Sequence, residues 1–115
     1  MSKNIIVIGS CNTDMVIKAD RLPVPGETII GGSFMMNPGG KGANQAVAAA
    51  RLGGFVTFVT SLGNDMYADI LKNHFKKEGI TTDYIIDDVN HPTGTALIFV
   101  ADSGENCIAV APGAN

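Results

Sequence analysis

Apolar residues in this chain gather in short runs bounded by glycine, proline and polar residues. The runs at 4–9, 55–63 and 83–87 have the length of strands, and the first two are rich in β-branched residues, which is typical of strands buried on both faces of a parallel sheet. Helical patterns occupy 42–52 and 65–78, between these runs. An alternation of strand and helix predicts an α/β fold with a Rossmann-like parallel sheet.

The segment 65–78 has the clearest helical pattern. Asn64 or Asp65 can cap its start, acidic residues lie near that start, and lysines lie near its end, as the helix dipole favours. Gly79 ends it. The pattern places one set of residues on a shared face, at spacings of three and four: Tyr67, Ile70, Leu71, His74 and Phe75.

Four further strand patterns have no helices between them. They lie at about 14–18, 28–36, 94–101 and 106–111, and the second should bend at its Gly-Gly pair. Strands without crossover helices do not extend a parallel sheet. The sequence therefore predicts a second, separate small sheet.

Composition limits the class of protein. The 115 residues suffice for one modest domain, and 45% of them are apolar, so a core can form. The net charge is −3 and no basic stretch occurs, which argues against nucleic-acid binding. The apolar runs are too short for a membrane helix, and the N-terminus lacks a secretory signal pattern. Cys11 and Cys107 are expected to be free, reduced core thiols of a cytoplasmic protein.

A glycine-rich loop, "NPGG" at 37–40, leads through "KGANQAVAAARLG" into the first helix. It is not a phosphate-binding P-loop, because Lys41 is followed by Gly42 and not by serine or threonine. It is not a dinucleotide fingerprint either, because Gln45 stands where the third glycine belongs. The loop is therefore either a tight structural turn or part of a site for another kind of ligand.

Polar side chains suited to a hydroxyl-rich ligand lie near this loop and the first strand. Asn12 and Asp14 follow the carboxyl end of that strand, where open α/β sheets bind ligands, and Lys41 and Asn44 flank the helix start. Aspartate accepts hydrogen bonds, lysine donates them and asparagine does both. A sugar is one ligand that needs all three. Taken singly, Asp14 could merely form a turn and Lys41 could be a solvated lysine.

The same stretches resemble the ribokinase-like sugar kinases. "NPGGKGANQAVAAARLG" is similar to the N-terminal signature of that family, "GSCNTD" to its first sugar-binding turn, and "PVPGET" to the segment that follows. "GTALIFV" with "GENCIAVAPGAN" resembles its lid hairpin. The resemblance covers essentially the whole chain. It implies that residues 1–115 form the N-terminal part of a ribokinase-like domain, in which the second sheet is the lid.

The resemblance also implies an activity, which is ATP-dependent transfer of phosphate to the 5-hydroxyl of D-ribose. By position, Asn12, Thr13 and Asp14 would line one wall of the sugar site. The other wall would consist of Gly40, Lys41, Gly42, Ala43 and Asn44, and the lid would add apolar contacts from Ala96, Ile98 and Val110. Members of the family also form homodimers through their lids.

One expected motif is absent from these residues. The family's catalytic aspartate lies in a Gly-x-Gly-Asp motif, and no such motif occurs in residues 1–115. "LGND" ends in Asp65, which is expected to cap a helix. The sites for ATP, Mg²⁺ and a monovalent cation such as K⁺ would also lie mainly outside this segment. We therefore predict no catalytic residue and no metal site here, and no turnover by these residues alone.

Three other interpretations stay open at this point. The chain could be a non-catalytic module for sugar binding or dimerisation, or part of another sugar kinase of the same family. A dinucleotide-dependent oxidoreductase is the third, and the missing third glycine argues against it.

Overall fold

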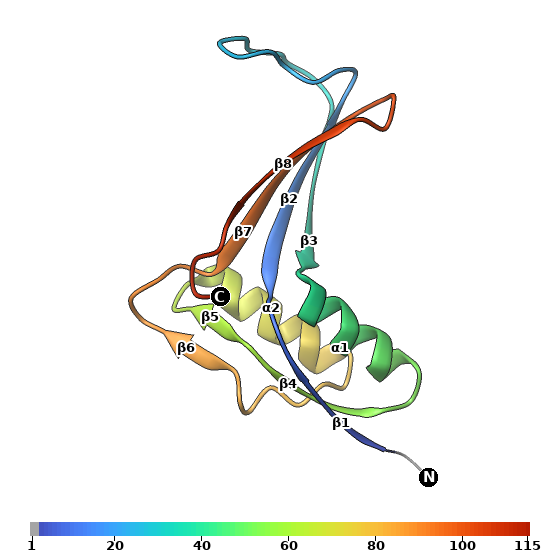
Figure 1. Cartoon of the computed structure of the whole chain (residues 1–115), viewed down its shortest axis with the longest axis vertical. Coiled ribbons are helices and arrows are strands. Elements are labelled where there is room, and N and C mark those ends of the chain that lie inside the picture. The colour runs from blue at the N-terminus through green and yellow to red at the C-terminus, as the bar shows by residue number, and fades with distance from the viewer. Residues whose placement is uncertain (1–2) are drawn as a thin grey trace.

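The computed structural model describes residues 3–115 and has two parts, an α/β body and a sheet that projects from it (Figure 1). The Cα radius of gyration is 16.0 Å. A compact chain of this length would have about 13 Å. The difference reflects the projecting sheet, which extends the molecule to 52 Å along its longest axis.

The body alternates strands and helices. Its elements are β1 (Asn4–Ile8), α1 (Lys41–Arg51), β4 (Phe55–Val59), β5 (Ser61–Gly63), α2 (Met66–Lys77) and β6 (Ile86–Asp88). β1 pairs in parallel with β4, and β5 pairs in parallel with β6. The prediction of a parallel α/β sheet is therefore confirmed. No helix in residues 3–115 is long and apolar enough to cross a membrane.

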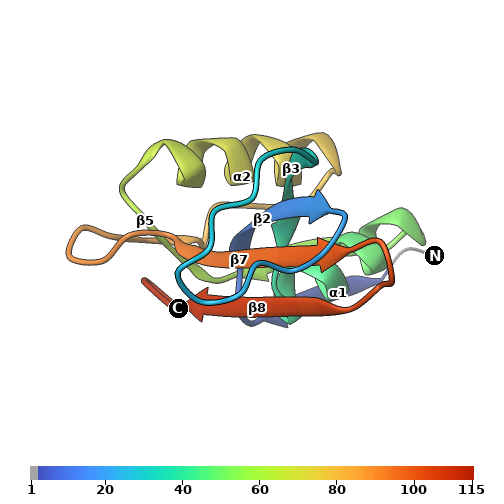
Figure 2. The same cartoon turned by 90° about the horizontal axis from the view of Figure 1, so that it is seen from above.

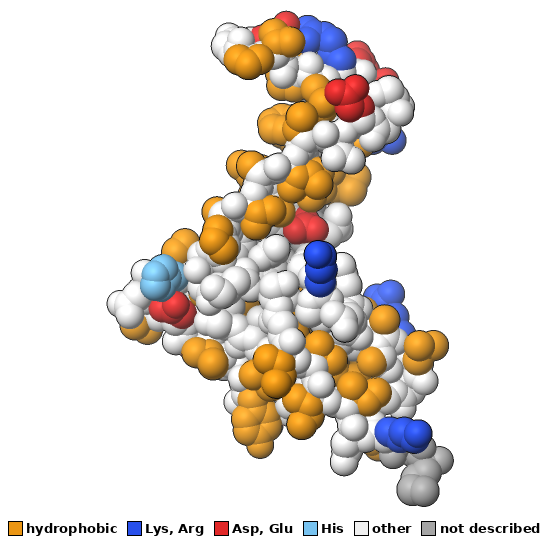
Figure 3. All heavy atoms as spheres, viewed as in Figure 1, with side chains coloured by type: hydrophobic (Ala, Val, Ile, Leu, Met, Phe, Trp, Pro, Cys, Tyr) orange, Lys and Arg blue, Asp and Glu red, His pale blue; other side chains and the backbone are white. Residues whose placement is uncertain are grey.

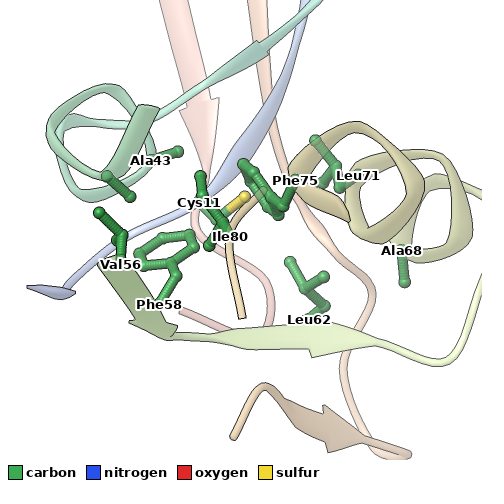
Figure 4. Packing of buried hydrophobic residues seen from close by; sticks show 10 residues of the cluster. Cys11, Ala43, Val56, Phe58, Leu62, Ala68, Leu71, Phe75 and Ile80 are labelled. Carbon is green, nitrogen blue, oxygen red and sulfur yellow. The ribbon is translucent and has the colours of Figure 1, made fainter. Parts of the chain in front are cut away.

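Both helices cover the same face of the β1–β4 pair. Val56 and Phe58 of β4 point between them, and the Phe58 and Phe75 rings meet edge to face with centroids 5.2 Å apart (Figure 4). Side chains alternate along a strand, so Ile6 and Ile8 of β1 point to the opposite face, where they are exposed. Within residues 3–115, the core thus lies on one face of the β1–β4 pair.

The projecting sheet, called the lid sheet below, has the strand order β3-β2-β7-β8. Its strands are β2 (Asn12–Ala19), β3 (Ser33–Gly39), β7 (Gly94–Ala101) and β8 (Asn106–Ala111). β2 runs parallel to β7 and antiparallel to β3, and β7 forms a hairpin with β8 (Figure 2). The bounds of β7 and β8 are those that the apolar pattern predicts.

Several boundaries differ from the predictions. β3 begins at Ser33 and not at residue 28, because Gly31 and Gly32 have φ angles of +126° and +88° that end an extended strand. β2 begins earlier than predicted, at Asn12, so Asn12 and Thr13 also lie on the strand. The run at 55–63 forms two strands separated at Thr60. The strand predicted at 83–87 starts three residues later and ends one residue later, as β6.

Two predictions about burial need correction. On α2 the buried residues are Ala68, Leu71 and Phe75, whereas Ile70 is exposed. The inward face is therefore rotated from the predicted one towards Ala68. Both cysteines are free, as predicted, but only Cys11 is in the core, because Cys107 lies on the exposed strand β8.

Candidate functional site

The lid sheet meets the body where the β1–β2 turn contacts the start of α1. Gly42 lies directly against Gly9: a Cβ added to Gly42 would be 2.7 Å from the Gly9 Cα. The Ala43 amide donates a hydrogen bond of 3.0 Å to the carbonyl oxygen of Ser10. This close backbone approach holds residues 40–44 beside the first residues of β2. The structure therefore brings together the two segments that the sequence analysis selected.

Gly40 provides the backbone conformation for this junction. Its φ is +96°, a region that residues with a side chain rarely adopt. A Cβ there would also lie 2.8 Å from the Ser10 carbonyl oxygen. Glycine is thus required at this position by conformation and by space, which explains the sharp turn from β3 into α1.

Asn12 and Asp14 share one face of β2 because they are two residues apart. Asp14 is paired with Asn37 of β3 and with Ala96 of β7, and Ala96 is paired with Val110 of β8. Residues paired across neighbouring strands point to the same face of the sheet. This row is therefore polar on β3 and β2 and apolar on β7 and β8. Ile98, two residues after Ala96, lies on the same face. All three predicted lid contacts therefore share the face that carries Asn12 and Asp14.

The Asp14 carboxylate is half-buried and unpaired. Burial raises its pKa above the usual 3.8, and within residues 3–115 it makes no hydrogen bond or ion pair. Gly39 lies next to it, and a Cβ at Gly39 would overlap the carboxylate. Burial, with a smaller contribution from Asp14, also raises the pKa of Cys11 to about 12, so this thiol stays protonated. Asp14 is thus a hydrogen-bond acceptor without a donor in the described chain.

Thr13 does not share this arrangement. Its side chain points to the other face of β2 and is 4% exposed, and its hydroxyl has no hydrogen-bond partner in residues 3–115. A contact between this hydroxyl and a ligand on the Asp14 face is therefore not supported. Lys41 and Asn44 are exposed at the start of α1, whereas Gly42 and Ala43 are buried. Of residues 40–44, only Lys41 and Asn44 thus combine a polar side chain with exposure.

Asp65 caps α2, as the sequence predicts, and also holds the lid sheet. Its Oδ1 accepts hydrogen bonds from the Ala68 amide at 3.0 Å and the Thr93 hydroxyl at 2.7 Å, and its Oδ2 accepts one from the Thr93 amide at 2.9 Å. Burial raises the pKa of Asp65, but these hydrogen bonds outweigh burial and lower it below 3.8. A carboxylate with these partners is suited to holding β7 in place and not to accepting a proton from a substrate.

A hollow lies between the two helices, and two of the predicted site residues, Ala43 and Asn44, are part of its lining. It has a volume of about 610 Å³, and its lining also includes Val47 and Ala48 of α1, Leu52 directly after α1, and His74 of α2. Its lining is mostly apolar and it is open to solvent. Asp14 and Asn12 do not line it, so the convergence of polar groups at the base of the lid identifies the candidate site better than size does. Within the described residues, no group of three or more His, Cys, Asp or Glu side chains could hold a metal ion.

Sequence reasoning missed three residues of this site. Gly39 and Gly94 leave space for the side chains of Asp14 and Asn12, and Asn115 forms hydrogen bonds with the start of β2. The glycine pair at 39–40 is a signal that could have identified Gly39. Asn115 gives no such signal, because it is 103 residues from Asn12 along the chain.

Comparisons with known proteins show which family the chain resembles. The family described as pfkB family carbohydrate kinase matches residues 2–115. The ribokinase of Bacillus subtilis (strain 168) is 50% identical over 98% of the chain, and that of Haemophilus influenzae is 48% identical over 100%. A structure of Arabidopsis thaliana ribokinase complexed with ribose and ATP superposes on all of the chain with a TM-score of 0.89 at 36% identity. The chain spans 38% of the length of each of these three proteins.

Proposed function

We propose that this chain, which belongs to the pfkB family of carbohydrate kinases, is the sugar-binding part of a ribokinase that transfers phosphate from ATP to D-ribose. The observation that carries the proposal is the unpaired Asp14 carboxylate, on one face with Asn12 and with the apolar residues Ala96 and Ile98. A sugar presents hydroxyl donors to the carboxylate and C–H surface to the apolar residues. The ribokinase relatives support ribose as that sugar.

In this proposal the described residues bind and orient the sugar but supply no chemistry. Asp14 accepts hydrogen bonds from hydroxyls, and Lys41 and Asn44 at the start of α1 approach from the opposite wall with Gly40, Gly42 and Ala43. Phosphoryl transfer also requires charge stabilisation around the phosphate. Residues 3–115 bring together no three His, Cys, Asp or Glu side chains that could hold a metal ion. We assign ATP binding, both ions and the catalytic base to other parts of the kinase.

We further propose that the lid sheet pairs two copies of the kinase. Phe34, Met36 and Leu97 lie on the face of the lid that points away from Asp14, and all three are exposed. Hydrophobic side chains cover much of the lid surface in Figure 3. An apolar patch of this kind marks an interface.

We also propose a cytoplasmic location for the kinase. Its two free cysteines are in keeping with a reducing compartment.

The test uses a chimera, called the completed kinase below, in which residues 1–115 replace the matching segment of the Bacillus subtilis ribokinase. The completed kinase should phosphorylate ribose in preference to fructose, 2-deoxyribose and adenosine. Asp14→Ala should raise the ribose KM at least tenfold, because hydroxyls of the bound sugar lose their acceptor, and leave the ATP KM within about twofold.

Two controls complete the test. Residues 1–115 alone should show no ribose-dependent ATP turnover, and Asp69→Ala, which changes an exposed aspartate on α2, should leave both KM values unchanged. An Asp14→Ala variant with an unaltered ribose KM would exclude Asp14 from the sugar site. Preference for another sugar would retain the family and change the substrate.

A further inference from the structure

The Asn115 side chain connects the end of the lid hairpin to the start of β2. Its carboxamide oxygen, Oδ1, accepts a hydrogen bond of 2.9 Å from the Cys11 amide. Its nitrogen, Nδ2, lies 3.1 Å from the Cys11 carbonyl oxygen, 2.9 Å from that of Pro112 and 2.8 Å from the Asn12 side chain. The shortest of these three contacts is with Asn12, one of the two polar side chains on the candidate sugar face.

The backbone of Cys11 determines which way both carboxamides point. A backbone amide can only donate and a backbone carbonyl can only accept, so the Asn115 atom facing each is identified without ambiguity. The Asn115 atom facing Asn12 is therefore a donor, and its partner on Asn12 must be the oxygen, Oδ1. This leaves Asn12 Nδ2, which has no hydrogen-bond partner within residues 3–115.

We propose that Asn115 is a positioning residue that fixes Asn12 with its Nδ2 amide directed to the sugar. The proposal rests on the sugar site proposed above. Asn12 then donates to a sugar oxygen, whereas Asp14, two residues along the same face, accepts from a sugar hydroxyl. A donor beside an acceptor matches a polyol, in which each hydroxyl can do both. A freely rotating Asn12 could present either group and would discriminate less between hydroxyl arrangements.

Gly94 supports this assignment independently. It is the residue paired with Asn12 between β2 and β7. A Cβ at Gly94 would overlap Asn115 Nδ2 and lie 2.5 Å from Asn12 Oδ1. The glycine therefore leaves open the space in which these two side chains form their hydrogen bond. The bond thus depends on three residues from β2, from β7 and from the segment after β8.

The substitution Asn115→Asp tests the proposal in the completed kinase. Aspartate has nearly the same shape and can still accept from the Cys11 amide, but it cannot donate to Asn12 Oδ1. Asn12 should then rotate, turn its Nδ2 to the new carboxylate and present its oxygen to the sugar. We expect the ribose KM to rise about tenfold and the ATP KM to stay nearly unchanged. The Tm should fall, because the new carboxylate also faces the carbonyl oxygens of Cys11 and Pro112, and the double-mutant cycle below separates this loss from positioning.

A double-mutant cycle with Asn12→Ala separates positioning from a general structural role. If Asn115 acts through Asn12, the double variant should have the ribose KM of Asn12→Ala alone. Equal effects of Asn115→Asp in both backgrounds would overturn the proposal. Asn73→Asp, the same change at an exposed site on α2, serves as the matched control and should alter neither KM. Gly94→Ala should reproduce the rise in ribose KM.

A second measurement reads the orientation of Asn12 without any sugar. In protein labelled with ¹⁵N-asparagine, the Asn12 side-chain resonance is assigned by its loss in Asn12→Ala. Asn115→Asp should shift this resonance, and Asn73→Asp should not; an unmoved resonance would overturn the proposal whatever the sugar binding. If the resonance moves but neither Asn12→Ala nor Asn115→Asp changes the ribose KM, the sugar-site assignment fails and the proposal fails with it.

Discussion

The base and the tip of the lid sheet are stabilised in different ways. At the base, Thr93 and Ala96 are almost fully buried, and side-chain hydrogen bonds connect Thr93 to Asp65 and Asn115 to the start of β2. Further out, the paired residues Ile17 of β2 and Phe34 of β3 are exposed. The base has its partners within the described chain, whereas the tip has only neighbouring strands.

This contrast indicates where the molecule is preorganised. Backbone-to-backbone packing, such as that of Gly9 on Gly42, allows little adjustment, so the polar groups of the candidate site are held in place before a ligand arrives. Towards the tip, apolar side chains such as that of Phe34 face solvent. Substitutions at the base should therefore change stability and sugar binding together, and substitutions at the tip should change association.

The largest effect on stability is expected at the closest backbone contact. In Gly42→Ala, the added methyl group would lie 2.7 Å from the Gly9 Cα, and α1 would have to move away from β1. Overpacking of this kind costs typically about 1–3 kcal/mol and occasionally more, and we expect the upper end, because backbone atoms cannot rotate away. Urea unfolding of the completed kinase measures it.

The control for Gly42→Ala is Asn73→Ala, on the exposed face of α2. Alanine also favours a helix over glycine by up to about 1 kcal/mol. A Gly42→Ala variant more stable than the parent would mean that this propensity outweighs the clash and that the base is less tightly packed than described.

A smaller loss is expected for Thr93→Val, which keeps the shape of the side chain and removes its hydroxyl. That hydroxyl donates to Asp65 Oδ1 and accepts from the Gly63 amide at 3.0 Å, and Thr93 is 2% exposed. An unsatisfied buried group costs about 1–3 kcal/mol. Thr82→Val, which removes a hydroxyl without a described hydrogen bond, is the control and should change stability little.

The pH dependence of the stability lost in Thr93→Val tests the role of Asp65. Because the pKa of Asp65 is lowered on folding, its ionised form stabilises the fold above its usual pKa of 3.8, and this stabilisation is lost as the pH falls through the lowered value. The difference between parent and Thr93→Val should therefore shrink in acid. A difference that is constant down to the lowest pH would show that Asp65 does not contribute through this hydrogen bond.

Local patterns predicted those elements whose ends have a local cause. The hairpin of β7 and β8 has its predicted bounds because a polar turn containing Gly104 separates two apolar runs. α2 starts at its predicted cap, since Asp65 is both a capping residue and close to the first apolar residues. The start of β3 was misplaced because the β-branched residues at 28–30 continue the strand pattern, although the positive φ angles at Gly31 and Gly32 interrupt it.

The candidate site was predictable in its composition but not in its geometry. Asn12, Asp14 and residues 40–44 were selected for their chemistry and from the resemblance, and the fold brings both segments to one place. Thr13 points to the face of β2 opposite Asp14 because β2 already starts at Asn12, and the sequence did not indicate this early start. The roles of Gly94 and Asn115 depend on contacts between distant segments, which no pattern in a single sequence reports.

The smallest effect on folding is expected at the exposed part of the lid, where association should change instead. Leu97 is 50% exposed. It follows Ala96 on β7 and its side chain is on the opposite face, so it points away from Asp14. In the completed kinase, Leu97→Glu should leave urea unfolding of the monomer nearly unchanged, because a surface side chain gains no buried charge. In the proposed dimer the same carboxylate would be buried against an apolar partner, which is strongly unfavourable.

Light scattering should therefore find dimers for the parent and monomers for Leu97→Glu, with a moderately raised ribose KM because the lid is less firmly held. Val89→Glu, a similar change in an exposed loop of the body, should remain dimeric. A parent protein that is already monomeric at micromolar concentration would show that the apolar face of the lid is not an interface between copies.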